Sequence, residues 1–125
     1  MSTLFLSLEE VLFLHAELIR RFGGNGGLRD RGLLESALAR PRSGYYETLS
    51  LQAAALLQSL CQNHAFVDGN KRVAFAATAI FLRMNGHSLR VTPDEGERFL
   101  IDRAIVGRAP LDEIAGWLER HMRAV

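Results

Sequence analysis

The residues whose types and spacing could do chemistry lie in one nine-residue stretch, His64 to Arg72 (HAFVDGNKR). Histidine is the side chain that most readily takes a hydroxyl proton near neutral pH, which makes His64 a candidate general base. Asp68 supplies the hard carboxylate oxygen that Mg²⁺ prefers, and Mg²⁺ normally accompanies nucleotide phosphates. Lys71 and Arg72 add positive charge, and a guanidinium can bind a phosphate through two hydrogen bonds. The stretch therefore combines a base, a metal ligand and a phosphate-binding cluster.

Strongly helical patterns flank this stretch, so residues 65–69 are predicted to form a loop. Asn70 is a good N-cap for the helix that follows, and Gly69 would let the backbone approach a ligand closely. The first N–H groups of that helix would favour an anion. Phe66 is the apolar residue that would anchor the loop in the core. A solvated surface loop would explain any one of these residues, but their order together favours a phosphate-binding site.

The order of residues resembles the signature of the Fic/Doc family, His-x-Phe-x-(Asp/Glu)-Gly-Asn-Gly-Arg-x-x-Arg. The chain differs at two positions: Lys71 stands where most Fic enzymes have glycine, and Phe75 stands where they have the second arginine. Asn-Lys-Arg at this point is similar to the Doc ("death on curing") toxin branch, and residues 22–41 also resemble Doc proteins. The resemblance covers roughly residues 8 to 100.

The resemblance implies an all-helical Fic fold and a transferase that uses ATP as its donor and Mg²⁺ as its metal. His64 would accept the proton of a target hydroxyl, and Asp68 would hold Mg²⁺. The motif backbone and cations would bind the phosphates, through Gly69, Asn70, Lys71 and Arg72.

Two transfer reactions are consistent with such a site. Typical Fic enzymes transfer AMP to a Ser, Thr or Tyr hydroxyl, whereas the Doc branch is understood to present the terminal phosphate to the base, as a kinase. Lys71 fills a position that AMP transfer leaves open, and Phe75 cannot bind phosphate, so the kinase reaction is expected. By resemblance, the target is a Thr on elongation factor Tu, and the result is a block of translation. The alternatives are a Fic-type AMP-transferase and a non-catalytic binding module.

Regulation is expected to come from a second protein. Fic proteins carry an inhibitory helix with the pattern (Ser/Thr)-x-x-x-Glu-(Gly/Asn). Residues 43–47 fit its first part, but Thr48 breaks its end. The Doc resemblance implies a separate antitoxin whose C-terminal segment folds on this protein, since folding on binding can cover a large surface.

Composition narrows the remaining possibilities. A chain of 125 residues fits a single domain, 1–125, and its net charge of +1 argues against direct nucleic-acid or membrane-surface binding. Cys61 is the one cysteine and is predicted to be a small buried residue, so a reducing compartment is expected. No signal peptide is recognised, and the longest near-apolar run, residues 73–82, is too short to span a bilayer, so a cytoplasmic protein is expected. The other histidines show no metal-ligand spacing with His64, which disfavours a metal hydrolase.

Hydrophobic periodicity predicts an all-α fold, a compact bundle of about six helices. The predicted helices cover residues 8–22, 31–39, 51–63, 70–84, a segment that Thr92 caps, and 110–122. Residues 41–50 are predicted to form a loop or flap, and residues 88–91 alternate like a strand too short to carry a sheet alone. The helix over 70–84 is apolar nearly all round, which places it at the centre of the bundle. His15 falls on the apolar stripe of the first helix, as a core histidine or as a residue near the site.

Overall fold

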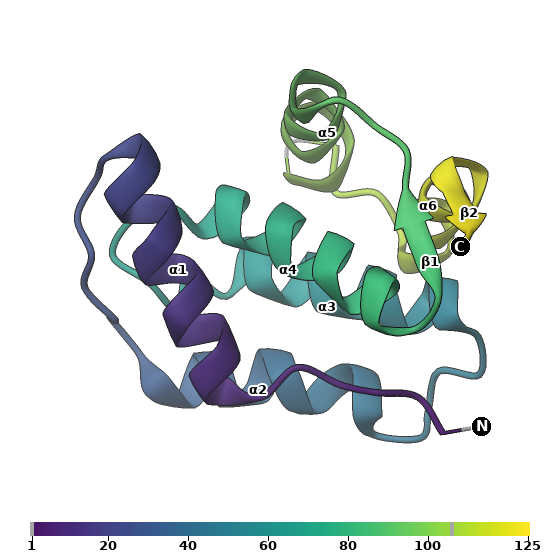
Figure 1. Ribbon diagram of the computed structural model, residues 1–125, viewed down its shortest axis with the longest axis horizontal. Helices are drawn as coiled ribbons and strands as arrows, with labels where there is room; N and C mark the ends of the chain where they lie inside the picture. The colour runs from purple at the N-terminus through teal and green to yellow at the C-terminus, as the bar shows by residue number, and fades with distance from the viewer. Residues whose placement is uncertain (1, 106) are drawn as a thin grey trace.

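The computed structural model describes residues 2–105 and 107–125, and its fold is mostly helical, as predicted (Figure 1). The described residues form six α-helices, one 3₁₀ helix, one π-helix and two short strands. In chain order these are α1 (Leu8–Phe22), α2 (Arg31–Ala39), η1 (Arg40–Arg42), α3 (Leu49–Gln62), α4 (Asn70–Met84), β1 (His87–Leu89), α5 (Pro93–Phe99), η2 (Leu100–Ile105), α6 (Leu111–His121) and β2 (Met122–Ala124).

Local capping signals define the helix ends that the sequence predicts. At the start of α1, the Glu10 N–H donates to Ser7 Oγ and the Ser7 N–H donates to Glu10 Oε1, at 3.1 and 2.8 Å. Thr92 and Glu95 form the same reciprocal capping box at the start of α5. Gly23, with φ of +84°, ends α1 and donates its N–H to the Ile19 carbonyl.

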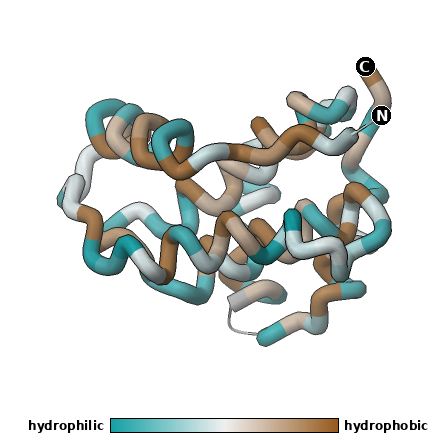
Figure 2. The backbone as a smooth tube through the Cα atoms, turned by 90° about the horizontal axis from the view of Figure 1, so that it is seen from below, coloured by the Kyte–Doolittle hydropathy of each residue, from teal (hydrophilic) through white to brown (hydrophobic). Residues whose placement is uncertain are grey.

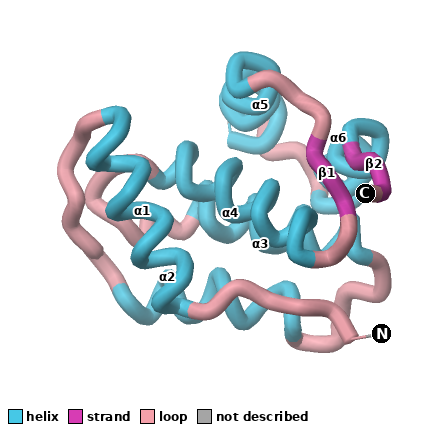
Figure 3. The backbone as a smooth tube through the Cα atoms, viewed as in Figure 1, coloured by secondary structure: helices cyan, strands magenta, loops and turns pink. Residues whose placement is uncertain are grey.

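The structure differs from the sequence-based prediction at one helix boundary and adds one strand pairing. α3 begins at Leu49 rather than Leu51, because the Thr48 hydroxyl accepts the Leu51 N–H and caps the helix there. The predicted strand has a partner that periodicity did not reveal: β1 pairs antiparallel with β2, so Ser88 lies opposite Arg123 (Figure 3).

The helix over 70–84 lies at the centre, as predicted. α4 lies beside α3 and is also covered by α1, α5 and β1 (Figure 1). Its fully buried side chains include Val73, Ala77 and Leu82. One face differs from the prediction, because Phe75 and Ala76 are only half-buried and line a cleft instead of the core.

Hydrophobic and hydrophilic segments alternate along the helices, as expected where each helix buries one face (Figure 2). None of the helices in the described part of the chain has the length and hydropathy needed to cross a lipid bilayer. The α1–α2 loop and the α3–α4 loop lie side by side at the same end of the molecule, to the left in Figure 1. The nine-residue motif is therefore supported by a segment that lies far from it in the sequence.

Candidate functional site

A cleft of about 640 Å³ opens where α1, α4 and α5 meet the α3–α4 loop. The structure brings six of the predicted site residues to its walls. They are His64, Asp68, Gly69, Asn70, Lys71 and Arg72. Phe66, the predicted anchor, lies beneath the cleft with only 2% of its surface exposed.

The α1–α2 loop holds the first half of the motif in place. The Val67 N–H donates to the Gly27 carbonyl at 2.9 Å, and Leu28 and Phe66 form an antiparallel bridge. The backbone N–H groups of Arg29 and Asp30 both donate to the Ala65 carbonyl. These bonds give the motif loop the backbone partners that a strand would have, and so keep its shape without a sheet.

His64 has an unusual backbone conformation, with φ of +52°. A residue with a side chain seldom adopts this left-handed region, and such residues cluster at functional sites. The Arg29 side chain stabilises the conformation, because its Nε donates to the His64 carbonyl at 2.7 Å and its Nη2 donates to the Asn63 carbonyl. The His64 side chain is exposed and lines the cleft, where a general base can reach a substrate hydroxyl.

Asp68 presents its carboxylate between two backbone N–H groups. Its Oδ1 accepts the Gly69 N–H at 2.8 Å, and its Oδ2 accepts the Asn25 N–H at 3.3 Å. Each oxygen keeps a lone pair for a cation. No group of three or more His, Cys, Asp or Glu side chains within 2–105 and 107–125 could hold a metal ion by itself. A single carboxylate fits Mg²⁺ that is bound mainly by substrate phosphates and water.

The N-terminus of α4 differs from the prediction at one residue. Gly69, in the left-handed region with φ of +78°, is the N-cap, and no side chain in the described part of the chain caps this helix. Asn70 is not the cap, because its amide turns back onto the loop. Its Oδ1 accepts the Phe66 N–H at 3.0 Å and its Nδ2 donates to the Phe66 carbonyl at 2.9 Å. The first-turn N–H groups of α4 therefore remain available to an anion in the cleft.

The cations of the motif are exposed at the same wall. The Arg72 guanidinium lies over the ring of Phe22 on α1, 4.5 Å from its centroid, so an aromatic side chain orients this charge. Lys71 lies close enough to Cys61 to act on its thiol. Burial raises the pKa of Cys61 to about 11, and the Lys71 charge opposes this only in part. Cys61 is 2% exposed, which confirms the prediction of a buried small residue.

The sequence is consistent with two roles for His15, a core residue or a residue near the site, and the structure places it under the motif. His15 is 2% exposed, its Nε2 lies 2.7 Å from the Asp68 carbonyl oxygen, and its ring stacks on Phe66. The only signal in the sequence was a histidine on an apolar stripe, which does not reveal which loop the stripe contacts.

Phe75 occupies the position of the second signature arginine, and the structure gives it a packing role. A Cβ at Gly96 of α5 would overlap the Phe75 ring, so the two helices approach closely at this point. This approach brings Glu97 and Leu100 into the wall of the cleft. Neither residue was predicted from the sequence as part of the site, because both lie outside the motif.

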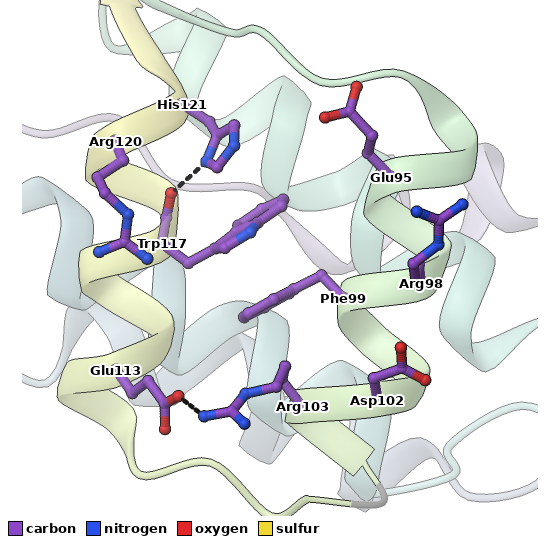
Figure 4. A pocket seen from close by; sticks show the side chains of 9 residues that line it. All are labelled: Glu95, Arg98, Phe99, Asp102, Arg103, Glu113, Trp117, Arg120 and His121. Carbon is purple, nitrogen blue, oxygen red and sulfur yellow. Dashed lines mark hydrogen bonds and ion pairs between the residues drawn. The ribbon is translucent and has the colours of Figure 1, made fainter.

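A second hollow, of about 450 Å³, lies between α5, η2 and α6 (Figure 4). Phe99 stacks on Trp117 with ring centroids 4.1 Å apart, and His121 packs against Trp117 at 4.4 Å. The Arg103–Glu113 ion pair links the two walls. Phe99 and His121 both pack against Trp117, so among the described residues this hollow offers a ligand no open aromatic face. The cleft at the motif is therefore the stronger candidate for a functional site.

Comparison with known proteins agrees with this choice. Residues 5–82 match the model of the Fic/DOC family, a span that includes the whole motif. The chain is 45% identical over 103 residues to "Toxin Doc" of Mycolicibacterium smegmatis, covering 78% of this chain and 79% of the relative. It is 33% identical over 119 residues to "Protein kinase doc" of Escherichia phage P1, covering 92% and 93% of the two chains. The resemblance seen in the sequence is confirmed: the chain belongs to the Fic/DOC family.

Proposed function

We propose that this protein is a Doc-like toxin of a toxin–antitoxin system, and that it transfers the γ-phosphate of ATP to a Thr or Ser hydroxyl of a protein target. By resemblance that target is elongation factor Tu, so translation would stop. The observation that carries the proposal is the shared cleft. In it the exposed His64 lies together with two cations and the N-terminus of α4, where none of the described side chains makes a capping hydrogen bond. The names of the two relatives, "Toxin Doc" and "Protein kinase doc", support it.

The chemistry follows from these positions. The target hydroxyl gives its proton to a ring nitrogen of His64 while its oxygen forms a bond to the γ-phosphorus. The bond from that phosphorus to the β,γ-bridging oxygen breaks, and ADP leaves. The first-turn N–H groups of α4, Lys71 and Arg72 stabilise the negative charge on the phosphates. Asp68 is the residue that would hold Mg²⁺, which when bound neutralises phosphate charge.

Phosphoryl transfer is favoured over AMP transfer by the packing of Phe75. In typical Fic enzymes an arginine at this position contacts the outer phosphates, but here the side chain packs against Gly96 and carries no charge. Lys71 adds charge where those enzymes have glycine. Both features fit a nucleotide whose terminal phosphate, rather than its α-phosphate, lies at His64.

A separate antitoxin is part of this proposal. The partial inhibitory pattern at residues 43–47 lies between η1 and α3 and not on a helix, and Tyr45 within it is 82% exposed. None of these five residues lines the cleft. An antitoxin segment that folds over the cleft would supply the inhibition, and its proteolysis would release the toxin.

Labelled nucleotides provide the decisive test. The protein is incubated with bacterial extract, Mg²⁺ and ATP that carries the label at either the γ- or the α-phosphate. Label in a protein band from γ-labelled ATP alone is the expected result, and His64→Ala should remove it. Label from α-labelled ATP would show an AMP-transferase, and ATP binding with no label from either nucleotide would show a binding module.

A further inference from the structure

We infer that His15 is a positioning residue for the motif, which fixes the peptide plane between Asp68 and Gly69 and thereby aims both the Asp68 carboxylate and the start of α4. This inference rests on the proposed function for its kinetic consequence, but its structural content can be measured without any reaction. His15 lies 53 residues before Asp68, outside the signature stretch.

The hydrogen bond has one possible direction. A carbonyl oxygen can only accept, so the short 2.7 Å distance between His15 Nε2 and the Asp68 oxygen means that Nε2 carries the proton and donates it. His15 is 2% exposed, so water cannot easily replace it as a donor. The Asp68 carbonyl therefore depends on His15 for its hydrogen bond.

That bond determines where the other side of the same peptide points. In a trans peptide the C=O and the following N–H point in opposite directions. With the Asp68 carbonyl held toward His15, the Gly69 N–H points away from α1, and it donates to Asp68 Oδ1 at 2.8 Å. The same peptide plane thus orients the carboxylate that would hold Mg²⁺. It also begins the left-handed turn at Gly69 from which α4 starts.

Ring stacking fixes the position of the donor itself. The His15 and Phe66 rings lie nearly parallel, at 11°, with centroids 3.7 Å apart. Phe66 is in turn bound through both of its backbone polar groups by Asn70. His15 is therefore clamped against the loop that it orients, and its Nε2 has little freedom to move away from Asp68.

Helix α1 lies directly against the loop at Gly69, whose φ of +78° disfavours a residue with a side chain. A Cβ at Gly69 would lie 3.5 Å from His15 Nε2 and 3.4 Å from Ile19 Cδ1. Further along α1, Leu18 and Phe22 form part of the cleft wall. The same helix therefore supports the motif from below and borders the cleft at its side.

The test compares two full-chain variants that are matched in length. His15→Gln retains an N–H donor at nearly the reach of Nε2, and His15→Met has none. Val11→Ala is the control, because it removes buried packing one turn earlier on the same helix. Three quantities are measured at a temperature where every variant is folded: the hydrogen-exchange rate of the Gly69 amide by NMR, and kcat and the nucleotide KM for transfer.

For His15→Met we expect Gly69 exchange to become faster by roughly 3- to 10-fold, the equivalent of one net hydrogen bond. We expect kcat to fall by about 10- to 100-fold while the nucleotide KM stays within about threefold, since misplacement of a site by an ångström has such effects. In His15→Gln the Gly69 exchange rate and kcat should both lie within about threefold of those of the unmodified chain. Val11→Ala should alter only the melting temperature.

Equal exchange and equal kcat in His15→Gln, His15→Met and Val11→Ala would overturn the inference. If His15→Met does not fold, His15→Phe replaces it, because that variant keeps a ring to stack on Phe66 and lacks the donor. If the unmodified protein transfers no label from any nucleotide, the proposed function has failed, and the Gly69 exchange rates alone decide whether His15 fixes the peptide plane.

Discussion

The side-chain amide of Asn70 bonds both backbone polar groups of Phe66, and so closes the motif loop into a ring. The two distances are 3.0 Å for the Phe66 N–H to Oδ1 and 2.9 Å for Nδ2 to the Phe66 carbonyl. An amide donates from its nitrogen and accepts at its oxygen, so this one side chain satisfies both groups of Phe66. The requirement for asparagine at this position therefore follows from the shape of the loop.

Replacement of Asn70 by aspartate should lower both stability and activity. The carboxylate can still accept the Phe66 N–H, but it cannot donate to the Phe66 carbonyl and would face it with like charge. We expect the free energy of unfolding to fall by about 1–3 kcal/mol, as for an unsatisfied buried group. Denaturant titration measures this change, and labelled-ATP assays measure transfer. An Asn70→Asp protein with unchanged stability would show that the closed ring is not required.

Gly24→Ala should disturb the carboxylate of Asp68 from the opposite loop. A Cβ at Gly24 would lie 2.6 Å from Asp68 Oδ2, and φ there is +114°. We expect transfer activity to fall by roughly 10-fold or more, since the carboxylate must move. Gly23→Ala is the matched control: φ is +84°, but a Cβ there meets nothing within 4 Å. Both variants carry backbone strain, so equal activity in the two would contradict the role of the Gly24–Asp68 approach.

Stability and activity should separate at His64. Because φ is +52°, His64→Gly should be more stable than His64→Ala by about 1 kcal/mol, since glycine tolerates the left-handed region. Both variants should lose transfer by a factor on the order of 10²–10⁴, the usual effect of removing a general base. Thermal unfolding and initial rates give the two quantities. Full activity in either variant would rule out His64 as the base.

The contact between α4 and α5 should tolerate no side chain at Gly96. Gly96→Ala would push a methyl group into the Phe75 ring, and we expect a loss of about 1–3 kcal/mol from overpacking. Gly116→Ala on α6 is the control, because its Cβ would meet only the flexible end of Arg120 at 3.4 Å. That change should stabilise its helix by up to about 1 kcal/mol. Adding Phe75→Ala should relieve Gly96→Ala in a double-mutant cycle, and strict additivity would show that the two residues are not coupled.

Stability should fall at alkaline pH because of Cys61. Burial raises the pKa of this thiol from 9.0 to about 11. Between these values the unfolded chain releases a proton that the folded chain keeps, so ionisation favours unfolding. The contribution of the protonated Cys61 thiol to the free energy of unfolding is fully present below pH 9, and it is lost as pH rises toward 11. Chemical unfolding of the parent and of Cys61→Ala across this range gives the comparison, and parallel curves for the two proteins would contradict the expectation.

The sequence predicted the local features of this fold well because their interactions are local. Ser7 and Glu10 of the capping box are three positions apart, and the motif from His64 to Arg72 is continuous. Both can therefore be recognised from residues that are close together in the sequence. Where two local signals competed, the prediction was wrong. Asparagine is a residue type that commonly caps helices, but the Asn70 side chain bonds Phe66 instead, and Gly69 is the N-cap.

The sequence alone determined the family motif, the mostly helical fold and the central helix, because hydrophobic period and short-range hydrogen bonds depend on neighbours along the chain. Only the tertiary structure decided which distant segments meet. It placed His15 on Asp68, Gly24 beside the same carboxylate, and β1 next to β2. These contacts join residues that lie more than 30 positions apart. They arise when helices pack their apolar faces, and the periodicity that defines such a face does not specify its partner.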